Sequence, residues 1–299
     1  MSLLPTTEID QIPTNFQGRM GYHIEDLNTG TIHQHNATQR FPTASVIKIA
    51  VMLELYTQVN QGRHTLDDRH RLEGDIATHG SGTLSILKDA PELTLRDFCR
   101  IMITVSDNSA TDFLMNLLSL DAINATLDEL GYSNIRASMT MGQYHFGMAH
   151  MEHLPCTPEN EELFNKRMAE GAKDYNSVSF SDSLKNNVAS PAELVDLLKR
   201  LQRGELVSPQ ASADMIDMLK LCNDRRMPNR DLDRSVEIAH KSGSSGRIKG
   251  NAGIVYLPSG PLVIATFALA SNDEVNGGDA IGDVSRRAIE ALSPECIAK

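Results

Sequence analysis

Ser45 and Lys48, three positions apart, are the residues of this sequence best suited to covalent chemistry. On a helix, side chains three residues apart share a face, so the hydroxyl and the amine would be neighbours. A serine attacks a carbonyl only when a nearby base accepts its proton, and the lysine amine could be that base. If Ser45 begins the helix, its backbone N–H lacks an intrahelical partner and could stabilise an oxyanion.

This Ser-x-x-Lys pattern is weak evidence by itself, because ordinary helix surfaces contain it often. The chain has a second one, Ser85 to Lys88, which we interpret as coincidence. The hypothesis for Ser45 and Lys48 therefore depends on suitable residues elsewhere in the chain.

The triplet Ser106, Asp107 and Asn108 stands between two predicted helices. Such a run commonly caps a helix or forms a turn, which would explain it without any catalytic role. In an active site, Ser106 would relay a proton toward a leaving nitrogen. Asn108 would hydrogen-bond the substrate or the lysine.

A third run, Lys241 to Ser244, ends a predicted strand. It could be a solvated strand end with a glycine turn. In an active site, Lys241 would place positive charge beside a substrate carboxylate, and Ser242 would donate a hydrogen bond to it. Gly243 would let a ligand lie against the strand, where the N–H of Ser244 would complete the oxyanion hole.

Together and in this order, the three runs resemble the motif set of class A β-lactamases and penicillin-binding proteins. The resemblance covers residues 19–292 apart from an irregular middle, and further matching stretches are Phe41 to Lys48, Gly80 to Leu84, Glu92 to Asp97 and Ala252 to Tyr256. It implies a serine hydrolase that acts on cyclic or activated amides, above all β-lactams. The acyl-enzyme would form on Ser45, and the resemblance implies no cofactor and no metal.

The sequence departs from the family at the glutamate that activates the deacylating water. The family has an asparagine four residues after this glutamate, and the best matching pair here is Glu161 with Asn165. The resemblance makes Glu161 the candidate general base, although it lies further from Ser106 than the family spacing, and acidic surface helices often contain such pairs. Without a working base, the acyl-enzyme would hydrolyse slowly.

Other departures concern the substrate carboxylate and the cysteines. Ser242 replaces the family's threonine, and Ala252 replaces an arginine that binds the carboxylate, a role that Arg247 or Lys249 could take. Cys99 resembles one half of a disulfide known in some members, but Met52 stands at the position of its partner. We expect all four cysteines to be reduced, namely Cys99, Cys156, Cys222 and Cys296.

These departures leave other functions open. One alternative is a cytoplasmic amidase, peptidase or esterase of the same fold with weak or no β-lactamase activity. Another is a covalent β-lactam sensor, which needs only failed deacylation. A binding protein without catalysis fits less well, because all three motifs keep their reactive side chains.

The elements that would position these residues follow an α+β order. Strands are predicted at 19–27 and 31–35, then helices at 45–59, 93–104, 110–118 and 124–130, an irregular stretch at 138–183 with a helix near 159–170, helices at 191–201 and 209–221, strands at 238–241, 251–257 and 262–270, and a helix at 281–292. Strands from both chain ends would form one antiparallel sheet flanked by helices, with a mainly helical region inserted between them. We expect a single catalytic domain, 19–292, with an α/β part at about 19–44 and 222–292 and a helical part at about 45–221.

The irregular stretch contains four potential metal ligands, His145, His150, His153 and Cys156. The spacing of the last three could place them on one helical face. A polar loop near a cleft explains them better, so we predict no metal site.

Composition narrows the partners and the location. A formal net charge of −11 argues against nucleic-acid binding. No apolar run approaches the roughly 20 residues of a membrane span. The stretch from Met1 to Pro13 lacks the pattern of a signal peptide, which favours the cytoplasm, or the periplasm or exterior if a leader was removed. We expect a small-molecule substrate and assume a monomer.

Overall fold

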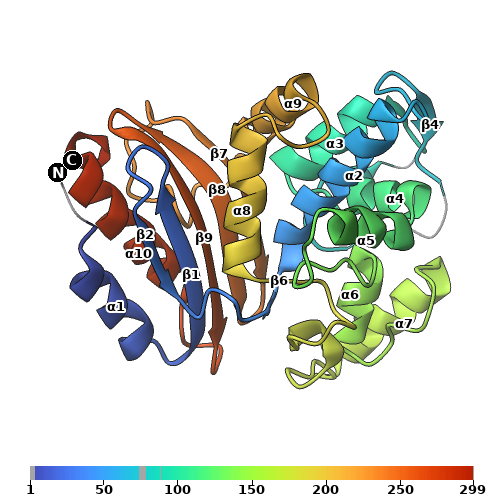
Figure 1. Ribbon diagram of the computed structural model, residues 1–299. Helices are drawn as coiled ribbons and strands as arrows, with labels where there is room; N and C mark the ends of the chain where they lie inside the picture. The colour runs from blue at the N-terminus through green and yellow to red at the C-terminus, as the bar shows by residue number, and fades with distance from the viewer. Residues whose placement is uncertain (1–3, 74–78, 88, 299) are drawn as a thin grey trace. The chain divides into compact units, whose positions relative to one another are not determined.

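The protein is described by a computed structural model that covers residues 4–73, 79–87 and 89–298 (Figure 1). It divides into two compact units. The sheet unit contains the residues up to 46 and from 189 onward, and the helical unit contains residues 47–188. Along the chain, the helical unit is therefore an insertion within the sheet unit, as expected.

The sheet unit is built on a five-stranded antiparallel sheet of strand order β2-β1-β9-β8-β7. The N-terminal β1 pairs with the C-terminal β9 over its whole length, from Gly18 opposite Ala270 to Asp26 opposite Leu262. Strands from both chain ends thus share one sheet, and the predicted α+β class is confirmed. The strands are β1 (Gly18–Asp26), β2 (Ile32–His35), β7 (Ile238–Ser245), β8 (Ile248–Leu257) and β9 (Gly260–Ala270).

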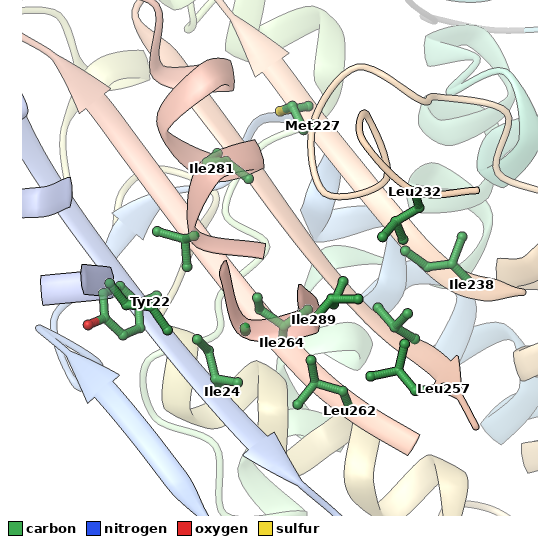
Figure 2. Close-up of a cluster of buried hydrophobic side chains, with 14 of the residues drawn as sticks. Tyr22, Ile24, Met227, Leu232, Ile238, Leu257, Leu262, Ile264, Ile281 and Ile289 are labelled. Atoms are coloured by element: carbon green, nitrogen blue, oxygen red, sulfur yellow. The ribbon is translucent and has the colours of Figure 1, made fainter. Parts of the chain in front are cut away.

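Helices cover both faces of this sheet (Figure 1). On one face, α10 (Gly277–Leu292) packs on β8 and β9, and α1 (Thr6–Asn15) packs on α10. Figure 2 shows the apolar core of this face, to which the sheet contributes Ile24 and Ile264 and α10 contributes Ile281 and Ile289. The opposite face is covered by α8 (Pro191–Gln202), followed by α9 (Pro209–Lys220).

Two features of the sheet unit differ from the expectation. The stretch before β1 forms α1, although its polar composition gave no helical signal, because Ile9 is fully buried in the α10 core. In addition, α8 and α9 belong to the sheet unit, whereas the predicted helical part extended to about 221. The apolar side of α8, with Leu194, Leu197 and Leu198 buried, packs against β1 and β9.

The helical unit contains mostly short helices. The predicted irregular stretch is partly helical here, with α6 and α7 inside it, and a buried cluster of Phe146, Met151, Cys156 and Phe164 joins these two helices. The elements of the unit are α2 (Lys48–Asn60), β4 (Arg69–Arg71), β5 (Glu92–Thr94), α3 (Leu95–Thr104), α4 (Asn108–Leu118), α5 (Leu120–Glu129), α6 (Met141–Gly147) and α7 (Pro158–Ala169), and the short β6 (Val188–Ala189) lies at its boundary. Among the described residues, no helix is both long and apolar enough to cross a bilayer.

The segment that leads to Ser45 is fixed on the sheet by an aromatic pair. Phe41, in the two-residue strand β3 (Phe41–Pro42), stacks on Phe267 of β9 with ring centroids 5.8 Å apart and an interplanar angle of 11°. Two glycines make room for these rings. A β-carbon would lie 2.5 Å from Phe41 at Gly21 and 2.6 Å from Phe267 at Gly250.

We predict that Ile264→Ala lowers the free energy of unfolding by about 2–5 kcal/mol, since it leaves a cavity in the α10 core. Urea unfolding followed by circular dichroism measures the change. Ile32→Ala is the matched control, because Ile32 is 51% exposed and should change stability by less than about 0.5 kcal/mol. Equal losses in the two variants would contradict the assignment of this core.

Candidate active site

Lys48, the first residue of α2, has a fully buried side chain surrounded by oxygen atoms. Its Nζ donates to the carbonyl of Ser106 at 2.7 Å, to Asn108 Oδ1 at 2.9 Å and to Ser106 Oγ at 3.2 Å. A buried amine needs such acceptors to remain in place. The structure therefore brings together three of the residues expected at the site: Lys48, Ser106 and Asn108.

The triplet at 106–108 combines a structural and a chemical role. Ser106 has a φ of 57°, which is uncommon for a residue other than glycine and is often found at functional sites. Asp107 caps α4 by accepting from the N–H of Ala110 at 2.9 Å. The same carboxylate accepts from the N–H groups of Thr83 and Leu84 at 2.5 and 2.8 Å, and so ties the 79–84 segment to the triplet.

Glu161 lies in α7 and reaches the same region through a histidine. Its side chain is 8% exposed, and Oε2 lies 2.6 Å from Nδ1 of His79. The carbonyl of His79 in turn accepts from Nδ2 of Asn108 at 3.2 Å. Asn165, the other half of the expected glutamate–asparagine pair, is exposed.

Of the residues expected in the sheet unit, Gly243 lies beside Ser45. Ser45 belongs to the short helical turn Ala44–Ile47, which continues directly into α2, and Ala44 has a φ of 44°. A β-carbon at Gly243 of β7 would lie 3.0 Å from the backbone N of Ser45 and 2.4 Å from the carbonyl of Thr43. Only glycine permits this approach, which brings the strand of Ser244 next to the Ser45 N–H.

Lys241 and Ser242 occupy β7 with different surroundings. Lys241 is fully buried and donates to the carbonyl of Ser242 at 2.9 Å. Burial lowers the pKa of this amine and Arg226 adds to the effect, whereas Cys222 and Asp224 oppose it. The hydroxyl of Ser242 donates to Asp224 Oδ2 at 2.6 Å, and Arg226 holds that carboxylate with two hydrogen bonds of 2.9 and 3.0 Å.

Cys222 is hydrogen-bonded to His240 and interacts electrostatically with Lys241. Burial would raise the pKa of the Cys222 thiol, but its hydrogen bond to His240 and the charges of His240 and Lys241 lower it to about 6. His240 is held by Asn251, whose Nδ2 lies 2.9 Å from its Nδ1. All four cysteines are buried and form no disulfide.

The remaining candidates are dispersed. Lys249 donates to Ser244 Oγ at 2.7 Å, whereas Arg247 forms an ion pair with Asp273 at 3.2 Å. His150 pairs with Asp174 at 2.9 Å on the surface. Among the described residues, no three histidine, cysteine or acidic side chains are grouped as metal ligands. Lys88 of the second Ser-x-x-Lys pattern lies outside the described residues.

A model of one protein family, described as the beta-lactamase enzyme family, matches residues 4–292. The chain belongs to this family. Its serine hydrolase fold is therefore that of the beta-lactamase family, as the three motifs indicated.

Individual relatives of this beta-lactamase family protein are distant. Beta-lactamase L2 of Stenotrophomonas maltophilia is 26% identical over 132 residues, which is 44% of this chain and 43% of that protein. The solved structure of a beta-lactamase from Sphaerobacter thermophilus has a TM-score of 0.75 and 28% identity, covering 96% of this chain and 95% of the other. PBP-A has a TM-score of 0.76 with 24% identity over 96% of this chain and 94% of its own, which supports the fold alone.

Some residues of the family protein's site were not identified from the sequence. His79 and Asp224 are hydrogen-bonded to the predicted site residues Asn108 and Ser242, and Arg226 and Cys222 interact electrostatically with Lys241, but none of the four belongs to the three motifs. His79 directly precedes Gly80 to Leu84, a stretch that resembles the family, and this position was the available signal for it. The side chains of Asp224 and Arg226 lie on a loop with no regular pattern.

We predict that Gly243→Ala strongly slows labelling of Ser45 by a serine-directed fluorophosphonate, because the new methyl group would displace β7 from the Ser45 N–H. We expect the rate of labelling to fall about tenfold or more, as measured by intact mass over time. Gly171→Ala is the control, since its φ of +83° strains the backbone while open space surrounds the site. Equal labelling in the two variants would contradict a role for the close approach.

We also predict a pH dependence of stability from Asp224. Burial would raise the pKa of its carboxyl, but hydrogen bonds from Arg226 and Ser242 outweigh burial and hold the pKa well below the ordinary value. The resulting stability is present above the unfolded-state pKa of about 3.9 and is lost as the pH falls toward the folded value.

As the pH falls below about 4, the melting temperature of the parent should therefore fall by more than that of Asp224→Asn. Thermal melts at a series of pH values test this. Asp67→Asn is the control, because that carboxylate is 75% exposed and should leave the pH profile unchanged. Parallel profiles for the parent and Asp224→Asn would refute the prediction.

Proposed function

We propose that the protein hydrolyses β-lactams through an acyl-enzyme on Ser45. The observation that carries this proposal is the buried amine of Lys48, which is hydrogen-bonded to Ser106 and Asn108 and begins the helix that follows Ser45. A lysine in this position can accept the serine proton, and Ser106 can pass a proton to the departing nitrogen. The backbone N–H groups of Ser45 and Ser244 would hold the oxyanion.

Positive charge in the sheet unit supports an anionic substrate. A cavity of about 480 Å³ is lined by Ser244 together with Arg225, Arg226, Arg230 and Lys249, and by one acidic residue, Asp279. The chain as a whole is acidic. Arg226 is paired with Asp224 and Arg230 with three aspartates, so the local positive charge comes mainly from Arg225 and Lys249. In this proposal, Lys241 and Ser242 orient the substrate carboxylate, and the cations at the cavity add long-range attraction.

The relatives support the same substrate class. One structure similar to this chain, with a TM-score of 0.77 and 24% identity over 97% of each chain, is a PBP-A variant solved as an acyl-enzyme complex with penicillin G. That protein forms a covalent penicillin adduct, and we propose the same first step here. A cytoplasmic location remains part of the proposal.

The first experiment mixes the protein with a chromogenic cephalosporin and follows absorbance and intact mass, beside Ser45→Ala. We expect sustained turnover in the parent and none in the variant. A burst of one equivalent followed by a lasting adduct on Ser45 would indicate that the protein is a covalent sensor and not a hydrolase. No reaction at all would overturn the β-lactam proposal and favour an esterase, amidase or peptidase of the same fold.

A further inference from the structure

Glu161 is a buried carboxylate on a helix whose other residues are mostly exposed. In α7, Glu161 and Phe164 are the buried positions, and the Glu161 side chain is 8% exposed. Its Oε2 lies 2.6 Å from Nδ1 of His79. Since a carboxylate oxygen accepts, the ring nitrogen donates and carries its proton there. A buried carboxylate is costly without such a partner, so this contact fixes His79 on α7.

Aromatic rings of α6 and α7 hold the His79 side chain in the same place. Phe146 stacks on it with an interplanar angle of 13° and a centroid distance of 5.8 Å, and Phe164 packs at 5.0 Å. Both phenylalanines belong to the buried cluster that joins the two helices. The ring of His79 is therefore anchored by apolar packing and by a charge-assisted hydrogen bond together.

The main chain of His79 reaches the predicted site. Its carbonyl accepts from Nδ2 of Asn108 at 3.2 Å, and Oδ1 of the same amide accepts from Lys48 Nζ at 2.9 Å. A flipped amide would turn its oxygen toward the carbonyl and its NH₂ group toward the lysine amine, and both contacts would be unfavourable. The carbonyl of His79 thus selects the orientation in which Asn108 binds Lys48.

The residues that follow His79 strengthen the same connection. The carbonyl of Ser81 accepts from the backbone N–H of Asn108 at 2.9 Å. The hydroxyl of Ser81 donates at 2.7 Å to the carbonyl of Ser106, which also accepts from Lys48. All of these residues lie within the helical unit. A shift of His79 would therefore disturb two of the oxygen atoms that surround the Lys48 amine.

We propose that Glu161 and His79 are positioning residues that keep the Asn108 amide on the Lys48 amine. The carboxylate fixes the ring, the ring fixes the main chain of His79, and the carbonyl orients the amide. This role rests on the proposed function, in which Lys48 accepts the proton of Ser45. Glu161 then acts through His79 and not as the general base that the resemblance implies.

The first test measures the rate constant of Ser45 acylation by a chromogenic cephalosporin, with rapid quenching and intact mass. We expect Glu161→Ala to slow acylation about tenfold or more, because a displaced amine loses the geometry that proton transfer needs. Glu161→Gln keeps an oxygen that can accept from the His79 ring, so its rate constant should stay within a few-fold of the parent's. The dissociation constant of the cephalosporin should change only a few-fold in both variants.

A second pair of variants changes the other partner of the contact. His79→Ala should slow acylation as Glu161→Ala does, whereas His79→Asn keeps an N–H donor near the position of Nδ1 and should restore most of the rate. The matched control is His150→Ala, which removes a similar histidine–carboxylate pair from the surface and should leave acylation unchanged. If Glu161→Ala does not fold, the His79 pair provides the same comparison.

A spectroscopic measurement observes the amide without any reaction. In protein labelled with ¹⁵N-asparagine, the side-chain signal of Asn108 is assigned by its loss in Asn108→Ser. Because this amide is buried and donates to His79, its protons should exchange slowly with solvent in the parent. Exchange should become about tenfold faster or more in Glu161→Ala, and it should be unchanged in His150→Ala.

Three results would overturn the positioning role. They are parental acylation in Glu161→Ala, slow acylation with an unchanged Asn108 signal, and equal losses in Glu161→Ala and Glu161→Gln. A parent that protects the Asn108 amide but forms no adduct would instead overturn acylation at Ser45, and with it the part of this pair in catalysis.

Discussion

The burial of the Lys48 amine is the constraint from which much of the helical unit follows. An amine without exposed surface must be surrounded by acceptors, and here Ser106 and Asn108 at the start of α4 provide three of them. Ser106 adopts its left-handed backbone conformation in the same turn that directs its carbonyl to the amine. The carboxylate of Asp107 then accepts hydrogen bonds both from the first turn of α4 and from the 79–84 segment.

In the sheet unit, the corresponding constraint is the close approach of strand β7 to the backbone N–H of Ser45. Phe41 and Phe267 stack because Gly21 and Gly250 leave space, which fixes the chain that leads to Ser45. Gly243 then allows β7 to approach it without a side chain between them. Burial lowers the pKa of the Lys241 amine, and the negative charges of the Asp224 carboxylate and the Cys222 thiolate act in the opposite direction.

The sequence predicted those parts of the fold and the site that depend on short, local patterns. The three motifs each lie within four residues, so their types and order could be read directly, and the strands of the sheet have clear apolar signals. The contact between His79 and Glu161 joins residues 82 positions apart and depends on how α7 packs, which spacing cannot reveal. The N-terminal helix was missed for a similar reason, because one buried isoleucine in a polar segment gives no periodic signal. Likewise, nothing in the helical pattern of α8 shows that it packs on the sheet.

The tight contact between two glycines and the motif at 106–108 limits how this protein can diversify. A β-carbon at Gly80 would lie 2.3 Å from the Asn108 amide, and one at Gly82 would lie 2.4 Å from the Asp107 carboxyl group. Both glycines also have positive φ values, of +85° and +125°. Random mutagenesis of this segment would therefore yield mostly inactive clones at these two positions. Directed evolution toward new substrates would find its productive changes in side chains that do not support the triplet, such as those on the exposed side of α7.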